Sequence, residues 1–156
     1  MKAGQLKFPL RIPFVEELGL ELWGFGGGKA ELLVDLEQAH LNSWEVAHGG
    51  VLMTMLDVAM AHAARSNTSQ APHDAPGLAT IEMKTTFMRP AEGQLRALGT
   101  LLHKTTTMAF TDGSVFNEAG QLCAHATATF KFLRALPTTG RNAKPLQHNP
   151  TDKDSP

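Results

Sequence analysis

Residues 48–64, with the sequence HGGVLMTMLDVAMAHAA, constrain the fold more than any other part of the chain. The stretch opens on Gly49 and Gly50 and continues with residues that are apolar or good helix formers, so it predicts one long helix. A surface helix has an apolar stripe and a charged face, whereas this one is apolar on nearly every side. We therefore expect a helix buried in the core, with His62 at its solvent-exposed end.

The single acid of this helix, Asp57, stands in the middle of the apolar stretch. No Lys or Arg lies three or four residues away to neutralise it. Burying an unpaired carboxylate is costly or shifts its pKa. Two interpretations remain open from this stretch alone: the Asp faces a small polar pocket for structural reasons, or it is a catalytic carboxylate.

Composition limits the classes of protein to consider. The 156 residues suffice for one domain with one core, and the net charge of −1 argues against nucleic-acid binding by bulk electrostatics. The single cysteine, Cys123, excludes an internal disulfide, and the histidines have no paired metal-ligand spacing. The sequence has no apolar run of bilayer-spanning length and no signal-peptide pattern, so we expect no membrane partner and a cytoplasmic location.

The segments around the helix show strand patterns. Residues 12–18 predict a short helix begun by Pro13, and residues 20–36 predict a hairpin that turns at the glycines 26–28. Residues 68–77 are typical of a flexible connection. Four strands are expected after it, over residues 78–89, 93–103, 106–116 and 121–133.

The faces of these strands follow from alternation. In residues 78–89 it places Ala79 and Ile81 on one face with Met83, and residues 106–116 carry Met108, Phe110 and Val115. Small alanines alternate along residues 121–133 and leave room for a long helix. The order is hairpin, helix and consecutive strands, without βαβ alternation. We predict an α+β fold, an antiparallel sheet wrapped around one helix, over residues 1–136, with a disordered polar tail over 137–156.

The start of the helix has its own chemistry. Gly49 and Gly50 bring bare backbone N–H groups to a helix N-terminus, where the unpaired donors and the dipole favour negative charge. Such donors also suit an oxyanion that forms from a carbonyl group. Alternatively, the two glycines only permit tight packing of the helix on the sheet.

The distance between Gly49 and Asp57 adds a geometric constraint. Asp57 lies eight residues further along the helix, about 12 Å at ~1.5 Å per residue. This is too far for both to touch one carbonyl group. If both act on the same carbonyl, they must come from different chains, and a two-fold dimer with antiparallel helices would bring them together. Catalysis by this pair thus predicts an obligate dimer with two sites.

One motif combines the glycines and the acid with two earlier residues: Asn42, His48, Gly49, Gly50 and Asp57. At this spacing the motif resembles that of a known family, the hotdog-fold acyl-CoA thioesterases, and within it the phenylacetate-pathway (PaaI-like) subgroup. The resemblance covers roughly residues 13–133 and includes residues 77–91, which are similar to the family's strand after the helix. It implies a sheet wrapped around a central helix, a dimer or dimer of dimers, and hydrolysis of acyl-CoA without metal or cofactor.

The resemblance also implies a role for each matching position. Asp57 would be the nucleophile or general base, and the backbone N–H of Gly49 would polarise the thioester carbonyl. His48 and Asn42 would position the thioester or the water. Thr80 falls where relatives place a Ser or Thr that holds the attacking water. Strict alternation turns Thr80 away from the site, so only a bend at the start of its strand would aim it there.

Substrate binding is expected to involve two further residues. Gly50 lies beside the polarising amide, and Arg89 follows the matching strand and is the best candidate for a contact with CoA phosphates. Many relatives have a glycine three residues after the Asn, where this chain has Glu45, a difference that could change the course of the loop.

Two other functions are considered. A hotdog enoyl-CoA hydratase would pair His with an acid at a different spacing. A non-catalytic dimer that binds acyl-CoA would have no reason to bury Asp57 beside a thioester.

Overall fold

The computed structural model describes residues 1–67 and 77–133. Most of the predicted connection and the whole predicted tail lie outside these residues. The order of elements confirms the expected α+β arrangement of hairpin, helix and consecutive strands. The elements are α1 (Pro13–Glu17), β1 (Glu21–Gly26), β2 (Lys29–Asp35), a 3-10 turn η1 (Gln38–His40), α2 (Gly49–Arg65), β3 (Gly77–Phe87), β4 (Gln94–Lys104), β5 (Met108–Phe116) and β6 (Leu122–Leu133).

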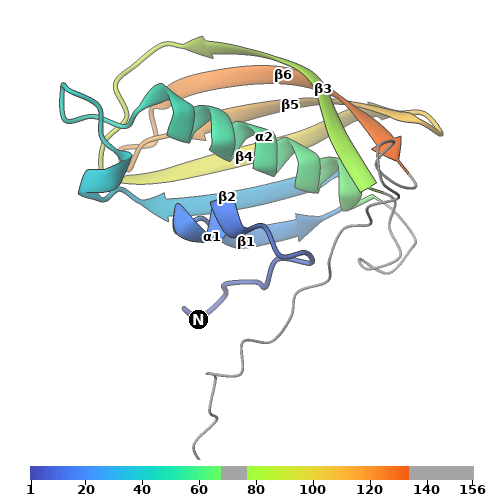
Figure 1. The fold of residues 1–156 in the computed structure, drawn as a ribbon, viewed down its shortest axis with the longest axis horizontal. Coiled ribbons are helices and arrows are strands. Elements are labelled where there is room, and N and C mark those ends of the chain that lie inside the picture. Colours follow the sequence, from blue (N-terminus) through green and yellow to red (C-terminus); the bar gives the residue numbers. More distant parts are fainter. Residues whose placement is uncertain (68–76, 134–156) are drawn as a thin grey trace, which may run out of the picture.

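The strands form one six-stranded antiparallel sheet in the order β1-β2-β4-β5-β6-β3. The sheet curls around α2, which lies along its concave face (Figure 1). The strand that directly follows α2, β3, pairs only with β6 and forms one edge of the sheet. No helix in residues 1–67 or 77–133 is long and apolar enough to cross a membrane.

Small residues allow α2 to lie close to the sheet. A Cβ added at Gly99 of β4 would be 2.4 Å from the carbonyl carbon and oxygen of Ala59, so the two backbones are in contact. A Cβ at Gly113 of β5 would be 3.2 Å from Leu56. The alanines of β6 that were expected to face inward, Ala124, Ala126 and Ala128, are buried. Small residues thus line the inner face of the sheet where α2 packs, as the alternation of residues 121–133 predicts.

The local turns follow from Pro and Gly. Pro13 lies in the first turn of α1, and Gly19, with φ +64°, ends it. Gly27 and Gly28 have positive φ and join β1 to β2. The left-handed conformation at these positions favours glycine because it has no Cβ.

The apolar residues that the sequence places in β5 do not share one face. Val115 is buried with Ala109 and Thr111, whereas Phe110 is 39% exposed and lies on the outer face. Register explains the difference, because Ala109 lies opposite the inward-facing Phe130. Bulky residues cannot occupy the inner positions of β5 since α2 approaches it so closely at Gly113.

The prediction that His62 lies at a solvent-exposed end of the helix was also wrong. His62 is only 3% exposed. Its ring packs edge-on against Phe8, at 5.2 Å between centroids, and Phe25, at 6.1 Å. Residues 1–12, which had no clear sequence pattern, pair with β1 through Leu6 and Leu22 and bring Phe8 over the end of α2.

Candidate active site

The first turn of α2 has one free backbone donor. His48 is the N-cap, and its Nδ1 accepts a hydrogen bond of 2.9 Å from the N–H of Gly50. The N–H of Val51 donates to the carbonyl of His48. Within the described part of the chain, the N–H of Gly49 has no hydrogen-bond partner. Of the two amides expected to be bare, only that of Gly49 is therefore available to a ligand here, because the other is capped.

The cap also determines the state of the His48 ring. Because Nδ1 accepts the hydrogen bond from Gly50, the proton of the neutral imidazole must be on Nε2. The His48 side chain is exposed, so this Nε2–H is able to donate to a ligand beside the helix terminus. The backbone N–H of His48 donates to the carbonyl of His40, which anchors the cap.

Asp57 lies on the side of α2 that faces β3. Its Oδ1 accepts a hydrogen bond of 2.7 Å from the hydroxyl of Thr80. Burial raises the pKa of Asp57, and the bond from Thr80 opposes this by stabilising the charged form. Among the described residues no cation forms an ion pair with the carboxylate. The result is a half-buried carboxylate with a single hydrogen-bond donor and an increased proton affinity.

A bulge in β3 explains how Thr80 reaches Asp57. The register with β6 slips between Thr80 and Glu82, so that Ile81 is an extra residue and is largely exposed. Thr80 then lies opposite Phe130 and Met83 opposite Ala128, and both face the helix. The bend required for this residue is thus present. The prediction that Ala79 and Ile81 share the face of Met83 was wrong, because the bulge shifts the alternation between Thr80 and Glu82.

The loop before α2 is held by Asn42. Its carboxamide oxygen accepts hydrogen bonds from the N–H groups of Trp44, at 2.9 Å, and Val46, at 3.4 Å. Glu45 has φ 60° and is the only described residue other than glycine with a positive φ. The backbone there has the conformation that a glycine would favour, although a side chain is present. Asn42 therefore shapes the loop that leads into His48.

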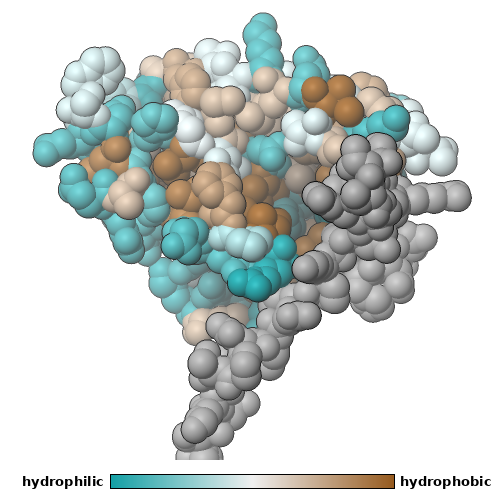
Figure 2. Space-filling view, in the orientation of Figure 1, coloured by the Kyte–Doolittle hydropathy of each residue, from teal (hydrophilic) through white to brown (hydrophobic). Residues whose placement is uncertain are grey.

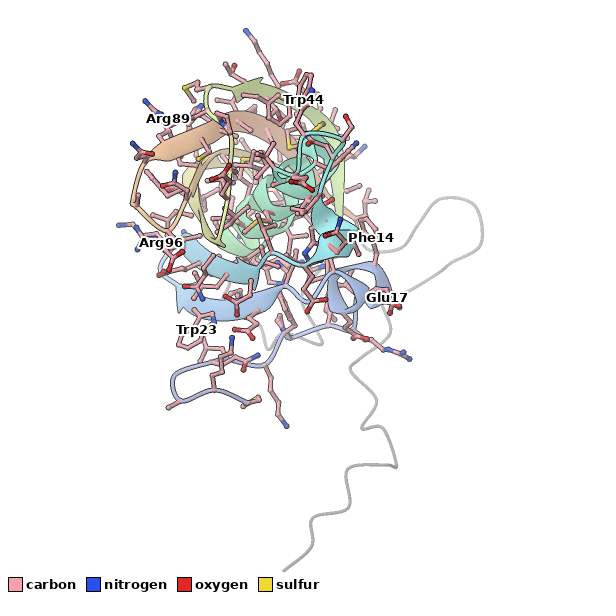
Figure 3. The ribbon with its side chains drawn as sticks, turned by 90° about the vertical axis from the view of Figure 1, so that its left-hand side faces the viewer. Phe14, Glu17, Trp23, Trp44, Arg89 and Arg96 are labelled. Atoms are coloured by element: carbon pink, nitrogen blue, oxygen red, sulfur yellow. The ribbon has the colours of Figure 1, made fainter. Side chains whose placement is uncertain are left out.

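Arg89 and Trp44 both lie at the end of the molecule where α2 begins (Figure 3). The guanidinium of Arg89 donates to the carbonyl of Leu122 at 2.7 Å, and its side chain is exposed. Trp44 is also highly exposed. Arg89 is thus at the same end as the Gly49 amide, where a ligand bound there would approach.

One face of α2 is not covered by the sheet. The residues on this face are only partly buried, whereas the rest of the helix is buried almost throughout, and Met53 is 39% exposed. Apolar side chains gather over α2 in the space-filling view, with hydrophilic residues around them (Figure 2). The open face consists of Gly50, Met53, Thr54, Asp57 and Ala61.

The structure brings the expected residues together in two groups. One group is His48, Gly49 and Gly50 at the start of α2, and the other is Asp57 with Thr80. Asp57 lies eight positions after Gly49 on the same helix, as the sequence predicts. No cluster of His, Cys, Asp or Glu suited to a metal ion occurs among residues 1–67 and 77–133.

Sequence reasoning missed Phe87 at this site. A Cβ at Gly49 would lie 3.4 Å from Cζ of the Phe87 ring, so the ring lies directly beside the glycine with the free amide. Phe87 lies on the inward face of β3, opposite Ala124. The sequence contained no signal that the ring would contact Gly49.

Comparisons with protein families and with solved structures found matches. A family model described as the thioesterase superfamily matches residues 45–124, which contain α2 and β3 to β5. No curated protein matches the chain significantly.

Several solved structures are similar to this one. A conserved protein from Pseudomonas aeruginosa is 27% identical, with a TM-score of 0.72 over 80% of this chain and 97% of that chain. A mutant of the phenylacetic acid degradation protein PaaI from Thermus thermophilus is 25% identical, with a TM-score of 0.68 over 78% of this chain and 100% of that one. PaaI from E. coli shares the fold at 19% identity, with a TM-score of 0.71 over 79% and 86% of the two chains.

Proposed function

Because the chain belongs to the thioesterase superfamily, we propose that it hydrolyses acyl-CoA thioesters to the free acid and CoA. The observation that carries this proposal is the pairing of two unlike groups on one helix. The Gly49 amide is an unpaired donor at a helix N-terminus, and Asp57 is a half-buried carboxylate with a raised pKa. The first suits a developing oxyanion, and the second suits a base or nucleophile.

In the proposed reaction the thioester oxygen accepts a hydrogen bond from the N–H of Gly49. The helix dipole favours the negative charge that develops there. The Nε2–H of His48 is a second donor for the thioester or the attacking water, and Asn42 acts through the loop that positions His48. Gly50 lacks a side chain that would obstruct the substrate, while Arg89 is available for a phosphate of CoA.

Asp57 acts in one of two ways. Either it attacks the carbonyl carbon, giving an acyl anhydride that water then hydrolyses, or it removes a proton from a water that attacks the carbon directly. In both cases the C–S bond breaks and the electron pair leaves with the sulfur as CoA thiolate. The raised pKa favours the second role, and the hydroxyl of Thr80 holds the carboxylate or the water in position.

The site is complete only in a dimer. Antiparallel packing of two copies of α2 would place Asp57 of one protomer beside Gly49 of its partner, with Met53 at the two-fold axis. The open face of α2 supports this arrangement because Met53 is at its centre and is partly exposed. β3 is an edge strand, so its outer edge is open to the same strand of a second copy.

The test is a panel of acyl-CoAs with detection of the free thiol, applied to the wild type and to Asp57→Asn. We expect the wild type to release CoA and the variant to lose most turnover while it remains a folded dimer by circular dichroism and light scattering. Asp112→Asn, a change on the outer face of β5, is the matched control and should keep normal turnover. Normal turnover by Asp57→Asn, or a monomeric wild type, would refute the proposal.

The same assay separates the two other functions. A hydratase would consume crotonyl-CoA without thiol release, as followed by loss of enoyl absorbance. A carrier would bind acyl-CoA tightly and release no thiol at all. Either result in the wild type would contradict thioester hydrolysis.

A further inference from the structure

Phe87 occupies an unusual position for an aromatic side chain. It is the last residue of β3 and lies opposite Ala124 on the face of the sheet that bears α2. Residues on this face are normally covered by the helix, yet Phe87 is 50% exposed. Its Cζ and Cε1 atoms are 3.4 and 3.5 Å from the place where a Cβ of Gly49 would be. In the single chain the ring therefore lies beside Gly49, and half of its surface is accessible.

This position limits where a bound thioester can lie. A carbonyl oxygen that accepts from the Gly49 N–H must be about 2.9 Å from that nitrogen. The carbonyl carbon carries two substituents, the acyl group and the sulfur of CoA, and the one that extends towards the end of β3 meets the Phe87 ring beside Gly49. The accessible part of the ring is the surface that it would meet.

Chemistry favours the acyl group as the neighbour of the ring. The pantetheine arm of CoA contains amide groups, which lose hydrogen bonds to water when they are buried against an apolar surface. The ring of Phe87 offers no partner for them. An apolar acyl group gains by leaving water at the same place.

We infer that Phe87 forms a wall of the acyl subsite and sets the size of the acyl group that reaches the Gly49 amide. This inference rests on the proposed hydrolysis of acyl-CoA. The ring is the large side chain here, since its partner in β6 is Ala124 and its partner in α2 is Gly49. A change in its size is thus expected to alter the space for the substrate directly.

The experiment compares Phe87→Leu and Phe87→Trp with the wild type. The substrates are a short acyl-CoA, butyryl-CoA, and a bulkier one, decanoyl-CoA, and the readout is the ratio of their kcat/KM values. Phe87→Leu should raise the ratio of kcat/KM for decanoyl-CoA to that for butyryl-CoA by about tenfold, and Phe87→Trp should lower it by a similar factor. If a variant displaced the Gly49 amide, kcat/KM would fall by the same factor for both substrates, and the ratio would not change. A change in the ratio therefore reports on the acyl subsite.

Phe110→Leu is the matched control, because it shortens another partly exposed phenylalanine on the outer face of β5. It should leave the ratio unchanged. If both Phe87 variants reduce all substrates equally, or only dissociate the dimer in light scattering, the inference is refuted while hydrolysis stands. If the wild type releases no CoA from any substrate, both the inference and the proposed function are refuted.

Discussion

Acid should destabilise this protein through His62, and the expected size of the effect follows from the structure. Nδ1 of His62 lies 2.8 Å from the carbonyl of Val58, so the neutral ring carries its proton there. Nε2 is buried and has no hydrogen-bond partner in the structure. Protonation would place a charge on a ring that packs against Phe8 and Phe25, and Nε2 has no acceptor within hydrogen-bond distance. Burial accordingly lowers the pKa of His62 from 6.5 to about 4.

The sign and size follow from linkage. Below pH 6.5 the unfolded chain takes up a proton at this histidine and the folded protein does not, so the stability is complete above that pH and falls as the pH decreases towards 4. The gap of about 2.5 in pKa corresponds to roughly 3 kcal/mol in total. Between about pH 7.5 and about pH 5 the loss amounts to ~2 kcal/mol.

Urea unfolding of the wild type and of His62→Met at both pH values, at one protein concentration, measures this loss. On going to the lower pH, the free energy of unfolding of the wild type should fall by about 2 kcal/mol more than that of the variant. Taking the difference between the two proteins removes the contributions of groups they share, including Asp57. His103→Gln, a change at an exposed histidine, is the control and should behave as the wild type does. Parallel losses in the wild type and His62→Met would refute the reasoning.

Three further predictions concern the site and the core. Thr80→Val removes the hydrogen bond that lowers the pKa of Asp57, so the acid limb of the pH–rate profile should move to higher pH, while Thr80→Ser should keep it in place. Glu45→Gly relieves a left-handed backbone and should raise the free energy of unfolding by up to about 1 kcal/mol, as measured in urea, whereas Glu45→Ala should not. Gly99→Ala forces a Cβ against the backbone of Ala59 and should cost about 3 kcal/mol or more in the same measurement; a loss below about 1 kcal/mol would contradict the close approach of helix and sheet.

Local signals explain the parts of the fold that could be predicted. The apolar stretch with two leading glycines predicts α2, and the actual helix, Gly49–Arg65, differs by only a residue at each end. Pro13 and the glycines 26–28 mark α1 and the first hairpin because their backbone preferences act within a few residues. The separation of Gly49 from Asp57 also depends only on helix geometry.

The errors arise where distant segments decide the outcome. The burial of His62 depends on residues 1–12, which return to cover the end of α2, and nothing in the helix itself indicates this cover. Which face of β5 points inward also depends on a distant segment, because α2 approaches Gly113 and leaves room beside it for Ala109 and Thr111. Alternation alone cannot choose between two faces when both contain apolar residues.

The position of Thr80 is a question of register and not of residue type. A strand without a bulge would keep Thr80 on the face of Glu82, away from Asp57, whatever hydroxyl residue stood there. One extra residue, Ile81, turns Thr80 towards the helix while Met83 keeps its place in the core. Within one protomer the bulge disturbs pairing with β6 alone, because β3 is an edge strand with no second neighbour in the described sheet. An edge strand is therefore the place where the fold can direct a side chain at Asp57 with the least loss of sheet hydrogen bonding.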